Sequence, residues 1–259
     1  MGGAAGTIET VKAETQVERY VRLNDFRMEH IMLGGAESLA GGAASTGLPR
    51  WRQQVQYAIG HTLNDFYSLQ PAVRRETPIQ FLLERRWPLR SSAFSSLMHY
   101  WDVKTAVGDE LMRLAPVNHT HEIPVMLYEQ WHTPVPELAV ELAMIFQLAW
   151  NSQRSGRCLN IQKFIVSGNE DVITGFLHMA NVFCHKAYGQ PADTIEIYSL
   201  LDSRRHIFDG AGVPLAESLD YVRLLSVFLE QDRTAYRNVS VEEGRNEKNE
   251  AALGGFGLM

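Results

Sequence analysis

Eight cationic side chains give the sequence its clearest chemical pattern. They fall in two stretches that are poor in acidic residues: Arg74, Arg75, Arg85, Arg86 and Arg90 in the first, and Arg154, Arg157 and Lys163 in the second. A guanidinium group binds phosphate through two parallel hydrogen bonds and also stacks on nucleic-acid bases. If the fold brings the two stretches together, we expect one groove that follows the phosphate backbone of single-stranded RNA or DNA.

Aromatic residues interleave with these cations: Trp51, Trp87, Tyr100 and Trp101. Such rings are stacking platforms in proteins that bind single strands. A structural explanation competes with this one. Cations in the last turn of a helix stabilise it by about 0.3–1 kcal/mol each. Tryptophans at helical spacing usually belong to the core. The alternatives are therefore a nucleic-acid groove and a solvated, salt-bridged surface.

A histidine-rich segment is the best candidate for a metal site. His119 and His121 lie one residue apart, and Glu129 and His132 form a Glu-x-x-His pattern on a possible short helix. Residues three apart share a helix face, as in di-iron carboxylate bundles, and three histidines can hold zinc. A di-iron site needs a second Glu-x-x-His, which the sequence lacks. Loop histidines bonded to backbone explain the segment without a metal, so we expect no metal and no cofactor.

Other catalytic patterns fail on their spacing. The Gly-Ala-Gly at 210–212 lacks the third glycine of a dinucleotide fingerprint, and no Gly-Lys pair marks a phosphate-binding loop. His178 and His185 share a helix face, but Cys184 points elsewhere because neighbours on a helix diverge by about 100°. No nucleophile, base and oxyanion donors form a recognisable set, so the sequence favours a protein without enzymatic activity.

The composition of the chain limits its cellular location and the kinds of partner it can bind. A formal net charge of −6 counts against a dedicated nucleic-acid-binding domain, although a local groove can be positive in an acidic protein. Two cysteines, Cys158 and Cys184, are too few for a disulfide framework, so we expect reduced thiols. No signal peptide is visible, and the most apolar stretch, from Leu138 to Trp150, is too short to cross a bilayer. We expect a cytoplasmic protein with no membrane partner, or one in the host cytosol or virion if it is viral.

Apolar residues recur at helical spacing along most of the chain, which predicts an all-α fold with a body of about seven helices. These helices are expected from Trp51 to Phe66, from Thr77 to before Pro88, from Ser92 to Val107, from Pro136 to Trp150, from Asn169 to before Gly189, from Asp193 to before Gly210, and from Pro214 to Glu230. Residues 116–136 hold four prolines and are expected to be mostly irregular. The stretch CLNIQKFIV at 158–166 is the one segment that could be a strand.

Composition also divides the chain into three parts. Residues 1–47 are expected to form an arm with one tethered helix and a flexible Gly/Ala-rich linker. Residues 48–236 form the helical body. Residues 237–259 lose helical periodicity and end in GGFGLM, so we expect a second flexible arm with one hydrophobic tip.

Together these features favour a non-enzymatic subunit that assembles with copies of itself. Tethered arms that reach onto neighbouring copies are a simple route to homo-oligomers and polymers. This organisation resembles that of the coat proteins and nucleoproteins of filamentous RNA viruses. The resemblance implies self-assembly around single-stranded nucleic acid held by the arginine-rich groove. Two alternatives remain open: an adaptor or scaffold in a larger complex without nucleic acid, and a helical metal-dependent enzyme that uses the His119–His132 region.

Overall fold

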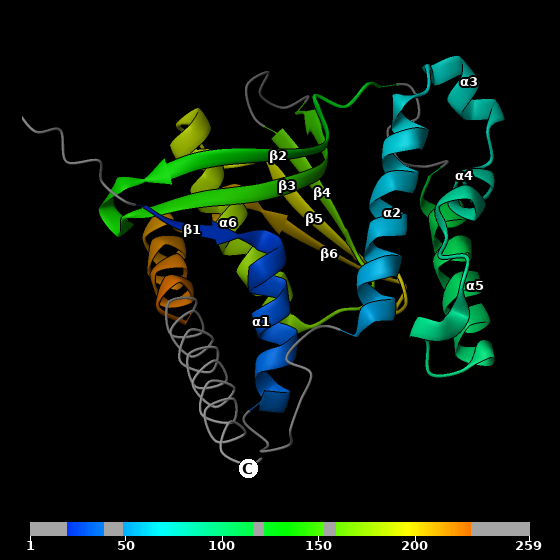
Figure 1. Ribbon diagram of the computed structural model, residues 1–259. Coiled ribbons are helices and arrows are strands. Elements are labelled where there is room, and N and C mark those ends of the chain that lie inside the picture. The colour runs from blue at the N-terminus through cyan, green and yellow to red at the C-terminus, as the bar shows by residue number, and fades with distance from the viewer. Residues whose placement is uncertain (1–19, 39–48, 116–121, 153–158, 229–259) are drawn as a thin grey trace, which may run out of the picture.

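A mixed six-stranded β-sheet forms the centre of the protein, so the expectation of an all-α fold is wrong. A computed structural model describes residues 20–38, 49–115, 122–152 and 159–228. Helices lie on both faces of the sheet, as Figure 1 shows. The chain therefore has the layered α/β architecture in which each helix buries one apolar stripe against a strand face.

Most of the described helices lie in the first half of the chain, and five of the six described strands lie in the second half. In order they are β1 (Val21–Asn24), α1 (Asp25–Ser38), α2 (Arg50–Ser68), α3 (Pro71–Glu76), α4 (Ile79–Arg86), α5 (Leu97–Leu114), β2 (Met126–Val135), β3 (Val140–Asn151), β4 (Leu159–Ile165), α6 (Glu170–Tyr188), β5 (Thr194–Ser199) and β6 (Arg204–Asp209). A last helix is described over 215–228. Short 3₁₀ helices cover Ser91–Ala93, Pro136–Leu138 and Gly210–Gly212.

The sheet is organised around β3. Strand β2 pairs antiparallel with β3 along its length, and on the other side β3 pairs with two strands in succession. Its first half pairs parallel with β1, from Val140 to Ala143, and its last residues pair antiparallel with β4, from Leu148 to Asn151. Strand β5 follows parallel to β4, and β6 closes the order antiparallel to β5. Residues 144–147 of β3 therefore lie between the end of one pairing and the start of the other.

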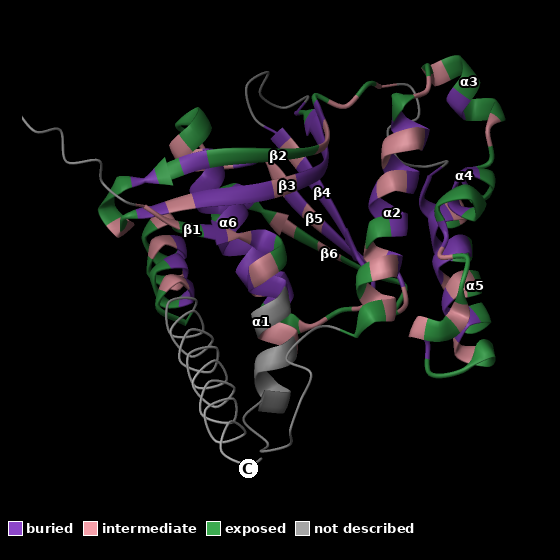
Figure 2. Cartoon of the chain, viewed as in Figure 1, coloured by how far each residue is buried: buried purple, intermediate pink, exposed green. Residues whose placement is uncertain are grey.

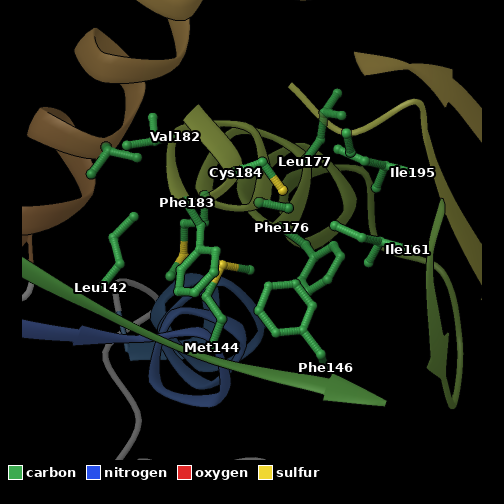
Figure 3. Close-up of a cluster of buried hydrophobic side chains, with 14 of the residues drawn as sticks. Leu142, Met144, Phe146, Ile161, Phe176, Leu177, Val182, Phe183, Cys184 and Ile195 are labelled. Atoms are coloured by element: carbon green, nitrogen blue, oxygen red, sulfur yellow. The ribbon is translucent and has the colours of Figure 1, made fainter. Parts of the chain in front are cut away.

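Two hydrophobic cores cover the two faces of the sheet, and Figure 2 shows the buried residues gathered on the strands and on the inner sides of the helices. Helices α1, α6 and 215–228 cover one face. Figure 3 shows part of this core, where Met144 and Phe146 of β3 meet Phe176 and Phe183 of α6. Helices α2, α4 and α5 pack on the other face with Trp150.

The two segments wrongly assigned as helices are strands of the sheet, and β3 and β5 among them are largely buried. Residues 140–151 read VELAMIFQLAWN, and almost all of them are buried because helices cover both faces. Such strands lose the apolar–polar alternation that would mark them, and a short apolar run does not distinguish a strand from a helix. The helix expected between Asp193 and Gly210 is instead the hairpin of β5 and β6, whose turn has Ser203 at φ 49°. Strand β2 occupies the region expected to be irregular, with Pro134 tolerated in a strand that pairs on one side only.

Other local predictions are confirmed. Helix α6 begins after Asn169, whose side chain accepts from the backbone N–H groups of Asp171 and Val172, and it ends at Gly189 with φ 73°. The strand predicted at 158–166 is β4. Helix α2 and the described part of the last helix also lie where helical spacing placed them. Helix α4 begins at Ile79, two residues later than expected, without a side-chain cap, and the Thr77 hydroxyl donates instead to the carbonyl of Val73.

The segment expected to be a tethered helix lies against the body. Strand β1 pairs with β3, and α1 packs against α6 and β3. Met28 is 2% exposed and its sulfur fills the space beside Gly175 of α6. The arms expected at 1–47 and 237–259 otherwise fall largely outside the described residues, so their boundaries stay predictions. Among the residues that the structure describes, no helix is long and apolar enough to span a membrane.

Candidate functional site

The first stretch of cations does not act as one surface. Arg74 is 1% exposed and holds backbone rather than facing solvent. Its guanidinium group donates to the carbonyls of Tyr67, Leu69 and Glu122, and it lies 4.9 Å from the centroid of the Tyr67 ring. The side chain therefore ties the end of α2 to the segment before β2.

The other predicted cations are divided between several places. Arg86 makes a two-hydrogen-bond pair with Asp65, which lowers the pKa of that carboxyl, while Arg75, Arg85 and Arg90 are exposed. Lys163 is buried in β4 and donates to Asp25 at 2.7 Å. Arg154 and Arg157 lie outside the described residues. Arg74 and Lys163 are therefore held by other parts of the fold and do not form one exposed surface with Arg75, Arg85 and Arg90, while the placement of Arg154 and Arg157 stays a prediction.

The proposed metal ligands are also only partly described. His119 and His121 lie outside the described residues. Glu129 and His132 are on β2, not on a helix, and residues three apart in a strand point to opposite faces. Glu129 accepts from the Trp131 ring N–H. In the part of the chain that the structure describes, no three histidine, cysteine or acidic side chains are placed to share a metal ion.

The histidines of α6 have structural surroundings. His178 Nδ1 lies 3.0 Å from the Ser218 hydroxyl, and its ring stacks on Tyr221 with centroids 4.5 Å apart. Burial lowers the pKa of His178. Asn181 also donates to Ser218, so α6 and the last helix are joined by a buried polar cluster. Cys184 is buried in the core under α6.

A cavity opens where β3 leaves its pairing with β1 and has not yet joined β4. Tyr128 of β2 has φ 51°, and the β2–β3 register contains no pair at Tyr128 and Gln147. Positive φ is unfavourable for a tyrosine, so the surrounding packing must hold it there. Phe146 belongs to the core under α6, whereas Leu148, two residues later, belongs to the core under α2. A regular strand keeps such residues on one face, so β3 twists sharply at this point.

Two glutamine side chains replace the missing strand pairing. Gln147 donates to the carbonyl of Phe164 and accepts from its N–H, and Gln56 of α2 donates to the same carbonyl and accepts from the N–H of Val166. Buried backbone groups must find partners, and these amides provide them on β4. The strands can therefore separate here without leaving the Phe164 peptide groups unpaired.

We call this space the inner cavity, and its volume of about 620 Å³ lies within the range of roughly 300–1,000 Å³ typical of small-molecule sites. Helices α1 and α2 and strands β2, β3 and β4 line it with aromatic, amide and charged side chains. The lining residues are Phe26, Arg27, Glu29, Arg52, Gln53, Gln56, Tyr57, Tyr128, Ile145, Gln147 and Lys163.

Charges of both signs meet at the inner cavity. Glu29 lies one helical turn after Asp25 on α1 and is 8% exposed. Burial raises the pKa of the Glu29 carboxyl, and the charges of Lys163 and Arg52 oppose that rise. Arg52 donates to the hydroxyl and the carbonyl of Ser167. The cavity wall thus has three cationic groups, from Arg27, Arg52 and Lys163, and one carboxyl group, from Glu29.

A second depression, the outer groove, adjoins the inner cavity along α2. Gln53 and Tyr57 line both spaces. The outer groove has a volume of about 690 Å³ and is also lined by Arg50, Arg86 and Arg90. A row of rings separates the two spaces: Tyr57 and His61 have centroids 4.4 Å apart, and His61 and Tyr128 have centroids 5.0 Å apart.

No protein-family model matches this sequence, and no curated protein matches it. Three of the eight predicted cations line these two spaces: Lys163 at the inner cavity, and Arg86 and Arg90 at the outer groove. The sequence prediction missed Glu29, Arg52 and Tyr128. These residues line one cavity only because β1 positions α1 beside α2 and β2. The one local signal was the pair Asp25 and Glu29, four residues apart on a helix.

Gly60→Ala tests the packing that positions Tyr128. A Cβ at Gly60 of α2 would lie 2.4 Å from the Tyr128 Cε2 atom, so the ring would have to move. We expect a loss of about 1–3 kcal/mol in the free energy of unfolding, as is usual for overpacking. Gly108→Ala, in α5, is the control because its new Cβ would meet only Leu83 Cδ2 at 3.6 Å. That change should be neutral or stabilise by up to about 1 kcal/mol. Equal effects in urea denaturation would contradict this account.

Proposed function

We propose that this protein binds single-stranded nucleic acid on the surface formed by the inner cavity and the outer groove. One nucleotide enters the inner cavity, and the neighbouring phosphates lie along the outer groove. The observation that carries the proposal is that the two spaces adjoin each other and share Gln53 and Tyr57 as lining residues, with cations on both sides of an aromatic row. Proteins that bind single strands combine these same two features, a cationic track and stacking rings.

Exposed rings at the mouth of the inner cavity support base stacking. Phe26 is 54% exposed and Tyr57 is 64% exposed, although both are large and apolar. A base has an aromatic face whatever its identity, so stacking on these rings is worth about 1–3 kcal/mol per base and tolerates many sequences. Two of the tryptophans expected to stack are placed differently, since Trp87 is 3% exposed and Trp51 packs on Phe94 and His99, whereas Trp101 is exposed but does not line either space.

Unneutralised cations in the outer groove support phosphate binding. Arg50 and Arg90 are exposed, and neither is in a salt bridge within the described part of the chain. Arg86 differs because Asp65 already occupies its guanidinium group. Arg50 and Arg90 are therefore the groups that a strand would engage first, and their contribution should fall as salt concentration rises.

Self-assembly through the terminal segments and the adaptor alternative are untested and stay predictions. A particle-mass measurement combined with the 260/280 nm absorbance ratio separates them. An assembly around nucleic acid gives a large particle with a raised ratio, whereas an adaptor gives a small particle with the ratio of protein alone.

The double variant Arg50→Ala/Arg90→Ala tests the proposed function. Fluorescence anisotropy with a labelled single-stranded 12-mer should show weaker binding for every sequence. The slope of log affinity against log salt should become shallower by roughly 0.7 per lost phosphate contact. Arg75→Ala/Arg223→Ala is the matched control, since it also removes two exposed arginines but neither lines these spaces. An equal loss in both variants, or no binding by the wild type at low salt, would overturn the proposal.

A further inference from the structure

We infer that the inner cavity selects guanine, and that Glu29 reads its Watson–Crick edge. This inference rests on the proposed function and names the base that the same site prefers. The carboxylate of Glu29 would accept from the N1–H and the N2 amino group of one guanine base. A base that is turned out of a strand is commonly recognised in this way, through its pairing edge and through stacking between apolar side chains.

Among the described residues that line the inner cavity, Glu29 has the only carboxyl group. It is 8% exposed, so a ligand that reaches it must enter the cavity rather than touch its rim. An ionised carboxylate accepts two hydrogen bonds side by side and donates none. The ligand group that suits it is therefore a flat edge with two adjacent N–H donors.

Among the common bases only guanine has such an edge. Its N1–H and N2 amino group lie next to each other. Adenine and cytosine each place one amino donor beside a ring nitrogen that is an acceptor, and uracil places one N–H between two carbonyl acceptors. Each of these three would face the carboxylate with at least one lone pair. A good bidentate contact discriminates against the wrong base by roughly 5- to 150-fold.

Four other polar side chains of the cavity already make hydrogen bonds within the fold. The amides of Gln56 and Gln147 bond to the backbone of β4. Arg52 bonds to Ser167, and Lys163 bonds to Asp25. These groups help to hold the cavity open and set its charge, and the Glu29 carboxyl supplies the acceptor pair that distinguishes guanine from the other bases.

The electrostatics of the cavity support this role. Burial raises the pKa of Glu29, while Lys163 and Arg52 lower it and Asp25 raises it. Arg27 adds a further positive charge at the same cavity wall. Two N–H donors from guanine would stabilise the ionised carboxylate, so guanine binding should release a proton and become tighter as pH rises through the pKa of Glu29.

The test compares four 12-mers of uridine that carry at the centre one guanosine, adenosine, cytidine or inosine. The wild-type protein should bind the guanosine strand roughly tenfold more tightly than the adenosine and cytidine strands. Inosine lacks the N2 amino group, so it should lose most of that preference without any change to the protein. Glu29→Gln should abolish the preference for guanosine, because an amide suits the adenine edge instead. Its salt slope should stay unchanged, since no phosphate contact is removed.

The outcomes separate this inference from the proposed function. Equal binding of all four strands by the wild type, or a guanosine preference that survives in Glu29→Gln, overturns the guanine inference and leaves strand binding intact. Absence of binding to every strand overturns both. Competition by free GMP is the last measurement. If GMP competes as strongly as the guanosine strand, guanine recognition stands and the ligand is a free nucleotide, which overturns the strand-binding function.

Discussion

Arg74→Ala should lower the free energy of unfolding by about 3–4 kcal/mol, one of the two largest single-residue effects expected in this protein. The side chain is 1% exposed and donates to the carbonyls of Tyr67, Leu69 and Glu122. Hydrogen bonds from charged donors contribute about 1.5–3 kcal/mol each, and buried acceptors that lose their donor keep the cost of desolvation. The carbonyl of Tyr67 belongs to the last turn of α2, where no backbone donor follows.

Arg75→Ala is the matched control for this experiment. Arg75 is the next residue of α3 but is exposed, and removing it deletes the same charge. We expect a change within about 0.5 kcal/mol, as for other surface substitutions. Urea denaturation of the two variants measures the difference. Similar midpoints for Arg74→Ala and Arg75→Ala would show that Arg74 does not hold these carbonyls.

The contrast between these neighbours explains why the first cationic stretch does not form one surface. Adjacent residues on a helix point about 100° apart, so Arg74 and Arg75 have opposite environments. In the sequence alone the two arginines cannot be distinguished, because both belong to the same cationic stretch. Which of the two is buried depends on the segment before β2, and this contact joins residues 48 positions apart. Tertiary contacts, and not the local sequence pattern, determine which of these cations is buried and which is exposed.

Helices were predictable where local signals agreed. Helix α6 has an Asn169 cap, acidic residues in its first turn and Gly189 after its last turn, and each of these acts over only a few residues. Strands β3 and β5 were not predictable in the same way. In β3, both faces are buried, so apolar and polar residues do not alternate. In β5, the pattern TIEIYS is typical of a strand, but the residues Asp193 and Gly210 at either end of the region favoured a helix. Cap-like residues also occur in turns, so they do not identify a helix alone.

The inner cavity could not be predicted because it results from an interruption of regular structure. It needs Tyr128 at positive φ, a glycine at position 60 to admit its ring, and the amides that replace strand pairing on β4. None of these has a pattern in sequence. Only Lys163, on the one predicted strand, was marked as functional among the residues that line the cavity. It was expected to contact phosphate on a surface, and instead it is 8% exposed and paired with Asp25.

Lys163→Met should lower the free energy of unfolding by about 3–5 kcal/mol, because it leaves an uncompensated charge in the interior. Asp25 is 2% exposed, its Oδ2 accepts from Lys163 at 2.7 Å, and its Oδ1 is buried without a hydrogen-bond partner. The pair joins the start of α1 to β4 across 138 residues of sequence. Its loss should therefore loosen α1 as well as lower stability, and amide hydrogen exchange in residues 25–29 should accelerate more than exchange in α6.

Lys104→Met is a closely matched control. Lys104 also donates to a carboxylate at 2.7 Å, that of Glu84, and its ammonium also lies 5.0 Å from an aromatic ring, that of Trp101. For Lys163 the corresponding ring is Phe176, again at 5.0 Å. The pairs differ in the exposure of the acid, with side-chain values of 51% for Glu84 and 1% for Asp25. Since exposed pairs contribute about 0.2–1 kcal/mol, Lys104→Met should cost no more than that.

Asp25→Asn combined with Lys163→Met completes the experiment. Removing both charges avoids the buried, unpaired carboxylate, and replacing a buried ion pair by uncharged groups is often close to neutral. The double variant should therefore recover much of the stability that Lys163→Met loses, which gives a coupling free energy of about 2 kcal/mol or more in a double-mutant cycle. Additive losses would contradict a buried pair. They would mean instead that water reaches Asp25, and that Lys163 is free to meet an anionic ligand in the inner cavity.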